Sequence, residues 1–197
     1  MNAISFNYLT LVCLIILTLC PTHLPAQDTV KVKNRYSWLD FGIGATTYGI
    51  AADLGYYKEL NKGILSLRFT PNSEDTRYGI APAESVWDAG ILYGRLKKMS
   101  SGFASISAGL AAVGGVRRGK LVSQTNIDNY PSFYTYEKLT YFTLGIPLEA
   151  QICWIVFPQT SYFFICQTSF GIKAVANINS KKSFIGGLIC IQFGNLR

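Results

Sequence analysis

Six charged side chains could transfer protons or form ion pairs if the fold brings them together. They are four carboxylates and two cations spread over most of the chain: Asp40, Asp53, Arg68, Asp88, Glu149 and Lys173. Two adjacent carboxylates can act as general acid and general base, whereas a carboxylate beside a cation forms an ion pair. Nothing in the spacing singles out two carboxylates for acid–base work, so the elements that position these residues decide their chemistry.

Histidine, the side chain most often used for proton transfer near neutral pH, occurs only at His23. His23 falls in a segment that we expect to be cleaved off, as described below. A mature chain without histidine excludes Ser-His-Asp triads, Asp-His pairs and histidine metal sites. Ser-Lys and carboxylate-only schemes are the enzymatic alternatives that stay open. We therefore predict no catalytic residue, no cofactor-binding residue and no metal ligand.

The first 26 residues contain no Lys, Arg, Asp or Glu, and Leu9–Leu19 is an apolar run. Such a run, followed by Pro21 and a small residue at Ala26, is typical of a secretory signal peptide. We therefore predict a signal peptide over 1–26 and export of the mature chain. An uncleaved anchor is disfavoured because a membrane-spanning helix needs about 20 apolar residues. A lipoprotein attached at Cys20 is a second alternative.

The mature chain keeps three cysteines: Cys153, Cys166 and Cys190. An odd number of cysteines without close spacing matches neither a disulfide framework nor a set of paired metal ligands. We expect these cysteines to be small, buried apolar side chains.

Only 15% of the residues are charged, against about 25% in an ordinary soluble domain, and 49% are apolar. This composition excludes intrinsic disorder, which requires low hydrophobicity and high charge. Every charged residue lies after residue 26, so the net charge of +7 belongs to the mature chain. In an exported protein this excess favours anionic lipid or lipopolysaccharide phosphates as partners over nucleic acid.

Alternation of side-chain type at period two is the strongest pattern after residue 35, and it is typical of β-strands. No sustained helical period and no apolar run long enough for a membrane-spanning helix is present in this region. Eight segments show the alternation: 36–45, 48–59, 63–70, 85–97, 102–115, 138–155, 160–175 and 183–194. We predict an all-β fold of eight antiparallel strands that run up and down.

The two faces of the predicted strands differ mainly in side-chain size. In the sixth segment, Phe142 and Leu144 alternate with Thr143 and Gly145. The small face carries the six charged residues named above and is otherwise mostly Gly, Ser and Ala. It is too poor in charge to cover a soluble protein, but it fits the narrow interior of an eight-stranded transmembrane barrel whose bulky face meets lipid. The six charges then form an internal network that fixes strand register, and a soluble barrel or sandwich is the alternative.

Short and long connections alternate along the predicted strands. Tight turns are expected at 61–63, 98–101 and 157–159, and long connections at 71–84 and about 115–137. Outer-membrane barrels alternate in this way, with the short turns in the periplasm. The connection near Thr46-Thr47 is shorter than this pattern requires.

Aromatic residues near the predicted strand ends indicate two girdles at the membrane interfaces. One group is Trp38, Tyr56, Tyr93, Trp154, Tyr162 and Phe193, and the other is Tyr48, Trp87, Tyr141 and Phe184. Strand-end aromatics occur in any β-protein, which is the alternative explanation.

The connection 115–137 combines basic and aromatic side chains suited to a surface ligand: Arg117, Arg118, Lys120, Tyr134 and Tyr136. Cations beside aromatic rings bind phosphate groups and protein partners. This segment is a candidate for binding lipopolysaccharide phosphates or an envelope protein, but we favour the simpler interpretation of a solvated positive rim with girdle tyrosines.

Two short motifs resemble those of a known group of barrels. Leu144-Gly145-Ile146-Pro147-Leu148 is similar to a Gly-Ile-Pro-Leu stretch, and Ile191-Gln192-Phe193-Gly194 resembles a C-terminal assembly strand, although the chain continues to Arg197. The mature chain thus resembles the small outer-membrane β-barrel proteins of Bacteroidetes-type envelopes. This resemblance implies an outer-membrane location and insertion by the barrel-assembly machinery, but the family has no single activity to carry over.

The sequence therefore predicts three parts: a signal peptide at 1–26, a short periplasmic segment at 27–35 and an outer-membrane barrel at 36–197. We expect a non-enzymatic role in envelope structure or surface binding. An accessory subunit of a secretion or conjugation machine and a lipid-modifying membrane enzyme remain as alternatives.

Overall fold

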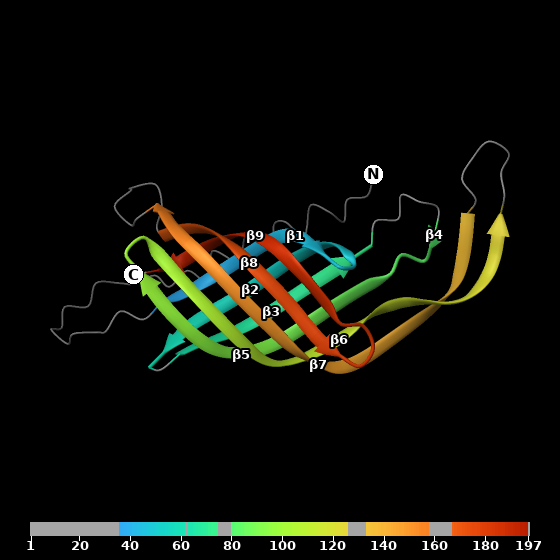
Figure 1. Cartoon of the computed structure of the whole chain (residues 1–197), viewed down its shortest axis with the longest axis horizontal. Coiled ribbons are helices and arrows are strands. Elements are labelled where there is room, and N and C mark those ends of the chain that lie inside the picture. The colour runs from blue at the N-terminus through green and yellow to red at the C-terminus, as the bar shows by residue number, and fades with distance from the viewer. Residues whose placement is uncertain (1–35, 62, 75–79, 126–132, 158–166, 197) are drawn as a thin grey trace, which may run out of the picture. The chain divides into compact units, whose positions relative to one another are not determined.

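The computed structural model describes residues 36–61, 63–74, 80–125, 133–157 and 167–196, within the compact unit Arg35–Arg197. The predicted signal peptide and periplasmic segment lie outside the described residues. Strands and their connections make up the described part (Figure 1), and none of it is a helix long and apolar enough to cross a membrane.

The described residues form eight long strands and one short strand. Their bounds are β1 Ser37–Thr46, β2 Gly49–Leu60, β3 Gly63–Ser73, β4 Ile80–Ala81, β5 Ser85–Met99, β6 Gly102–Thr125, β7 Phe133–Phe157, β8 Gln167–Asn179 and β9 Phe184–Asn195. The eight long strands pair antiparallel with their neighbours, and β1 pairs with β9 to close the sheet into a barrel. The two residues of β4 pair parallel with β7.

Strand register sets the tilt of the barrel. Starting from Gln151 of β7, the paired residue on each successive strand can be followed once around the barrel. The path returns to β7 at Tyr141, so the strands are staggered by ten residues. Eight strands with such a stagger tilt by about 35–45° and leave an interior that side chains can fill. The rows of paired residues therefore climb obliquely around the barrel.

All eight predicted strands are present, but β6 and β7 are much longer than expected. β3 extends to Ser73 and β4 lies at Ile80–Ala81, both within the connection predicted at 71–84, and β8 ends at Asn179 instead of 175. The prediction of a loop over 115–137 is wrong, because β6 continues to Thr125 and β7 begins at Phe133. Beyond the other long strands the two pair with each other as a ribbon (Figure 1), with register shifts between Arg118 and Ser123, and β4 pairs with β7 on this ribbon. A ribbon outside the barrel needs no alternation of faces, so period two does not reveal it. Residues 158–166, which include most of the expected turn at 157–159, lie outside the described residues.

The predicted division of the strands into an inner and an outer face is confirmed. Bulky apolar side chains point outward around the barrel, and Leu110 and Leu144 are 73% and 74% exposed. The alternate residues, such as Ser66 and Gln151, are buried inside. We call the outward-facing side chains the outward wall.

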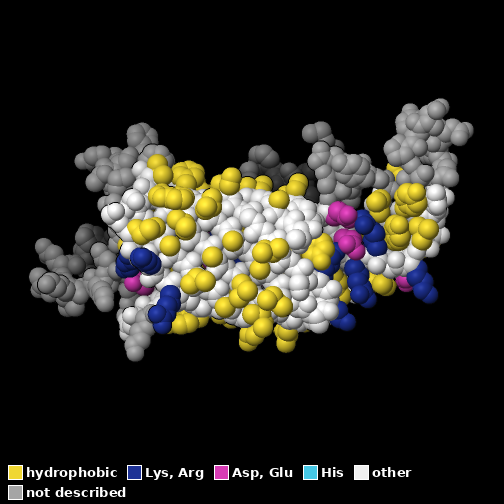
Figure 2. All heavy atoms as spheres, viewed as in Figure 1, with side chains coloured by type: hydrophobic (Ala, Val, Ile, Leu, Met, Phe, Trp, Pro, Cys, Tyr) yellow, Lys and Arg dark blue, Asp and Glu magenta, His cyan; other side chains and the backbone are white. Residues whose placement is uncertain are grey.

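The two ends of the barrel carry the charges. One end, where β1 begins and β9 ends, is the terminal end; the other, from which the β6–β7 ribbon extends, is the hairpin end. The outward wall between Arg95 at the terminal end and Arg117 at the hairpin end has no charged side chain among the described strand residues. On the face shown in Figure 2, Lys, Arg, Asp and Glu gather at the two ends, and apolar side chains lie between them.

The connection between β1 and β2 is a two-residue turn at Thr47 and Tyr48. The next residue, Gly49, has φ +110°, a backbone conformation that L side chains rarely adopt. A Cβ there would also lie 2.4 Å from the carbonyl oxygen of Ser73. Glycine thus permits the tight turn that the sequence pattern did not accommodate.

The assignment of strand-end aromatics to interfacial girdles is wrong for at least two residues. Trp38 and Phe184 are buried inside the barrel, with 1% and 4% of their surface exposed. Trp38 lies two positions before the inward-facing Asp40, so the strand pleat turns both side chains to the same side. By contrast, Trp154 and Tyr93 are exposed on the outward wall.

Candidate functional site

The six charged residues singled out in the sequence all lie inside the barrel, each at most 4% exposed. Lys173 of β8 is the centre of one group. Its Nζ donates to Asp40 of β1 and, at 2.6 Å, to Asp53 of β2. The amide of Gln192 donates to the second oxygen of Asp40 at 2.7 Å, and the Thr70 hydroxyl donates to Asp53 at 2.6 Å. One cation thus holds two carboxylates from neighbouring strands.

Arg68 of β3 is the centre of the second group. Its Nη2 donates to Asp88 of β5 at 2.6 Å, and its Nη1 lies 3.6 Å from Glu149 of β7. Nη1 also donates to the carbonyl oxygen of Leu148 at 3.2 Å, and the Asn177 amide donates to Asp88 at 3.0 Å. Both carboxylates near Arg68 therefore face a cation that is itself buried.

Tyr57 joins the two groups, and the sequence analysis did not single it out. Its hydroxyl donates to Glu149 at 2.9 Å and accepts a hydrogen bond from Lys173 Nζ at 2.9 Å. The ring stacks on Trp38, with centroids 5.0 Å apart. Tyr57 shares its parity with Asp53, which was the available signal. We call Asp40, Asp53, Tyr57, Arg68, Asp88, Glu149 and Lys173 the interior network.

Apolar clusters lie on both sides of the interior network. Toward the terminal end the core consists of Tyr36, Trp38, Tyr57, Ile64, Phe103, Cys153, Cys190 and Leu196. Toward the hairpin end it consists of Ala51, Val86, Ala111, Val113, Val175, Phe184 and Leu188. Close-packed side chains therefore fill the interior above and below the charged layer.

Two free thiols lie beside this network. Cys153 of β7 and Cys190 of β9 are buried, and the Gln192 amide donates to their sulfurs at 2.9 and 3.1 Å. Strand β8 separates the two backbones, with Gly171 paired to both cysteines. Because two strand spacings of about 4.8 Å exceed the reach of a disulfide, these two cysteines cannot form a disulfide with each other in this geometry. Cys166 lies outside the described residues.

A second cluster of charges lies at the hairpin end; we call Glu74, Glu84, Arg118 and Lys182 the hairpin-end cluster. Arg118 pairs with Glu74, and its Nε donates to the carbonyl oxygen of Pro82 at 3.1 Å. Lys182 donates to Glu84 at 2.6 Å, and the backbone N–H of Arg118 donates to the other Glu84 oxygen at 3.0 Å. Partial burial raises the pKa of Glu84, but the hydrogen bonds from Lys182 and Arg118 outweigh it and hold the pKa below its ordinary value.

The five candidate surface-binding residues lie on the β6–β7 ribbon, but the structure divides them. Arg118 is held by the hairpin-end cluster and lies 5.9 Å from the Tyr136 ring. Tyr134 pairs with β4 at Ile80. Arg117 and Lys120 are exposed and form no ion pair with the described residues. Of the five candidate residues, these two cations are therefore the ones exposed to solvent.

The arrangement of the interior favours stabilisation over catalysis. Each described interior carboxylate accepts from at least one buried donor, and the described residues contain no group of three or more His, Cys, Asp or Glu that could hold a metal ion. Fully buried charges of this kind are costly unless paired, so their pairing fixes the relative positions of the strands that carry them.

Two solved structures are similar in fold. The N-terminal β-barrel domain of Pseudomonas aeruginosa OprF has a TM-score of 0.49 and 10% identity, covering 81% of this chain and 96% of that chain. Neisserial surface protein A, NspA, has a TM-score of 0.49 and 8% identity, covering 82% of this chain and 97% of that chain. No protein-family model matches the chain, and no curated protein sequence matches it either.

Proposed function

We propose that this chain is an outer-membrane β-barrel with a structural, non-enzymatic role in the cell envelope. The outward wall carries the proposal, because it exposes large apolar side chains over all eight barrel strands and has charges only at its ends. Soluble monomers rarely expose apolar patches larger than a few hundred Å². A closed barrel also leaves no unpaired strand edge in hydrocarbon. The two motifs noted in the sequence favour a Bacteroidetes-type envelope.

The test is electrophoretic mobility after extraction in detergent. A folded barrel of this type is expected to migrate differently in unheated and heated samples, and to fractionate with outer membranes. A chain that stays in the aqueous fraction with no heat-dependent shift would exclude the membrane assignment.

The interior network supports a closed, structural barrel. Its ion pairs and hydrogen bonds connect β1, β2, β3, β5, β7, β8 and β9, with apolar clusters on both sides. We expect no steady ion conductance when the protein is reconstituted in planar bilayers. Sustained single-channel currents would contradict this part of the proposal.

The ribbon supports a surface-binding role for the same barrel. In the outer membrane with the terminal end in the periplasm, Arg117, Lys120 and Lys138 face the outside of the cell, where lipopolysaccharide phosphates are the abundant anions. Replacing Gly119–Thr135 by a two-residue Asn-Gly turn, together with Arg117→Gln and Lys138→Gln, removes all three cations and should lower binding to lipopolysaccharide vesicles while the heat-dependent mobility is kept. Unchanged binding would assign the cations to a solvated rim.

Docking of an envelope protein is the second candidate. Beyond Val116, β6 pairs only with β7 among the described residues, and Leu121 and Val122 on this part are 51% and 67% exposed. An exposed strand edge can accept a strand from a partner. Loss of a co-purified protein in the shortened variant, with lipopolysaccharide binding retained, would favour an accessory subunit of an envelope machine.

A further inference from the structure

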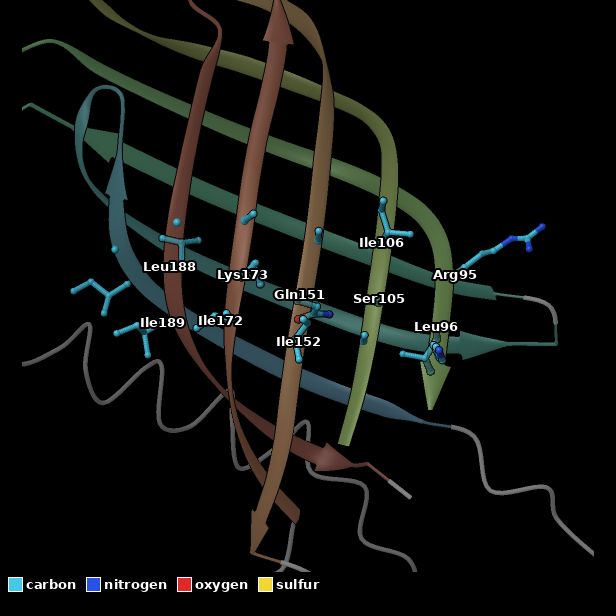
Figure 3. A pocket seen from close by; sticks show the side chains of 17 residues that line it. Arg95, Leu96, Ser105, Ile106, Gln151, Ile152, Ile172, Lys173, Leu188 and Ile189 are labelled. Atoms are coloured by element: carbon cyan, nitrogen blue, oxygen red, sulfur yellow. The ribbon is translucent and has the colours of Figure 1, made fainter. Parts of the chain in front are cut away.

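An open apolar groove with a volume of about 950 Å³ crosses the outward wall from β5 to β9. In the close-up, Arg95 lies at one side of the groove and Ile189 at the other, with Ile106 and Ile152 between them (Figure 3). A neighbouring hollow of about 430 Å³ shares Arg95 and Ile106 and extends the groove. Nothing in the proposed function uses this feature.

Strand register explains why the wall is hollow here. Arg95 pairs with Ile106, which pairs with Ala150, and the same row continues through Ala174 to Gly187. A second row of paired residues lies beside it, closer to the terminal end. On β7, β8 and β9 this second row carries larger side chains, namely Ile152, Ile172 and Ile189. On β7, β8 and β9 the small residues Ala150, Ala174 and Gly187 form a floor beside these branched side chains, and Ile106 borders the groove on the side of Arg95.

The groove runs obliquely along the barrel. Because rows of paired residues climb toward the hairpin end, the row begins with Arg95 near the terminal end and rises to Gly187. From β5 to β9 it crosses four strand spacings of about 4.8 Å, or roughly 19 Å. One leaflet of a bilayer with a hydrocarbon core of about 30 Å is roughly 15 Å deep. The groove is thus long enough to hold one acyl chain lying against the wall.

Two cations lie at the end of the groove that is nearer the terminal end of the barrel. Arg95 and Lys97 point outward from β5, are exposed, and form no ion pair with the described residues. The nearby Lys98 differs, because its Nζ lies 2.9 Å from Glu59. Long basic side chains at this depth extend their charges to the interface while their stems cover apolar surface.

We propose that the groove binds an anionic glycerophospholipid, with its phosphate at Arg95 and Lys97 and one acyl chain along the row to Gly187. Charge complementarity and the apolar lining both select this occupant. The proposal rests on the proposed function, since it requires the outward wall to face lipid. The lipid then comes from the leaflet at the terminal end, which is the periplasmic leaflet.

Native mass spectrometry tests the headgroup part. The folded protein is exchanged into detergent containing equal amounts of phosphatidylglycerol and phosphatidylcholine with identical acyl chains. Wild type should retain one phosphatidylglycerol in preference, and R95Q/K97Q should lower its occupancy by about 5-fold per cation removed. The matched control is K58Q, which removes an exposed cation of β2 near the same end but outside the groove. It should keep the preference.

A second variant tests the acyl-chain part. A Cβ at Gly187 would meet no atom within 4 Å, so Gly187→Leu fills the groove without disturbing the barrel. We expect it to lower retention of both lipids. The proposal is overturned if wild type retains the two lipids equally, or if K58Q and R95Q/K97Q lose phosphatidylglycerol equally. Binding of a second copy of the chain in place of lipid would also overturn it. Heat-dependent mobility is measured first on every sample, so a chain that is not a membrane barrel is recognised separately.

Discussion

The interior network and the hairpin-end cluster use the same kinds of ion pair in different surroundings. In the interior, the side chains of Arg68 and Lys173 are 0% exposed, and so are those of Asp40 and Asp88. At the hairpin end, the four side chains are 9–36% exposed. Water screens the second set, whereas the first has only its protein partners.

This difference in exposure determines how much each cluster contributes to the stability of the barrel. Removing one member of a buried pair leaves the other charge without compensation, which is strongly destabilising. Removing one member of a partly exposed pair lets water replace it. The interior network should therefore control whether the barrel forms, and the hairpin-end cluster should control only how its outer connections are arranged.

The largest effect is expected for Lys173→Met. It leaves Asp40 and Asp53 buried without their cation, and should lower the free energy of unfolding by about 3–5 kcal/mol. Urea unfolding in detergent micelles, followed by tryptophan fluorescence, measures this. Lys120→Met removes an exposed cation and should change stability by less than ~0.5 kcal/mol. Adding Asp40→Asn and Asp53→Asn to Lys173→Met should recover part of the loss; a single variant as stable as wild type would refute the contrast.

A smaller effect is expected for Tyr57→Phe, which removes the hydroxyl between Lys173 and Glu149 but keeps the stacked ring. The loss should be about 1–3 kcal/mol, because buried groups are left without their partner. Tyr56→Phe is the control, since Tyr56 is 42% exposed on the outward wall. If both variants lose the same stability under the same urea protocol, the bridging role of Tyr57 is wrong.

Glu84→Gln should lower stability by only about 0.2–1 kcal/mol, because its partners are partly solvated. The local effect at the hairpin end should be larger than this change in overall stability. We expect the connection between β3 and β5 to be cleaved faster by protease in the variant than in wild type. Raising the salt concentration should shrink the difference between wild type and variant, since screening weakens exposed pairs. Lys173→Met should show no such dependence on salt.

The smallest effect is the pH dependence of the hairpin-end cluster. Because the pKa of Glu84 is lowered in the folded protein, its contribution is complete above its ordinary value of 4.5 and is lost as the pH falls through the lowered pKa. Proteolysis of the β3–β5 connection should therefore accelerate at acidic pH in wild type. Glu84→Gln should remove this part of the pH dependence, and a variant that keeps it would contradict the assignment.

The faces of the strands could be predicted because the pleat alternates with a period of two. That rule alone turns Asp40 and Lys173 inward. It does not reveal that they touch, because contact across the barrel depends on the ten-residue stagger, which no single strand shows. Tyr57 was missed for a different reason: the interior set was chosen from charged residues, so a neutral hydroxyl was not considered, although its parity with Asp53 places this side chain inside.

The hairpin end was the least predictable part. Pairing of Arg118 with Glu74 joins residues 44 positions apart across a connection of irregular sequence. The ribbon beyond Val116 lies outside the barrel, so neither face needs to be uniformly apolar. Its strands are held by pairing with each other, and this leaves no periodic signal in either segment.

The rate of alkylation of Cys153 and Cys190 can report how often the closed barrel opens. Their thiols lie inside the barrel next to Gln192, so an alkylating reagent reaches them only when the wall between β7 and β9 opens. The rate at which these two positions are alkylated, read peptide by peptide, then reports how often the barrel opens. The native chain carries the label for this measurement without any engineered residue.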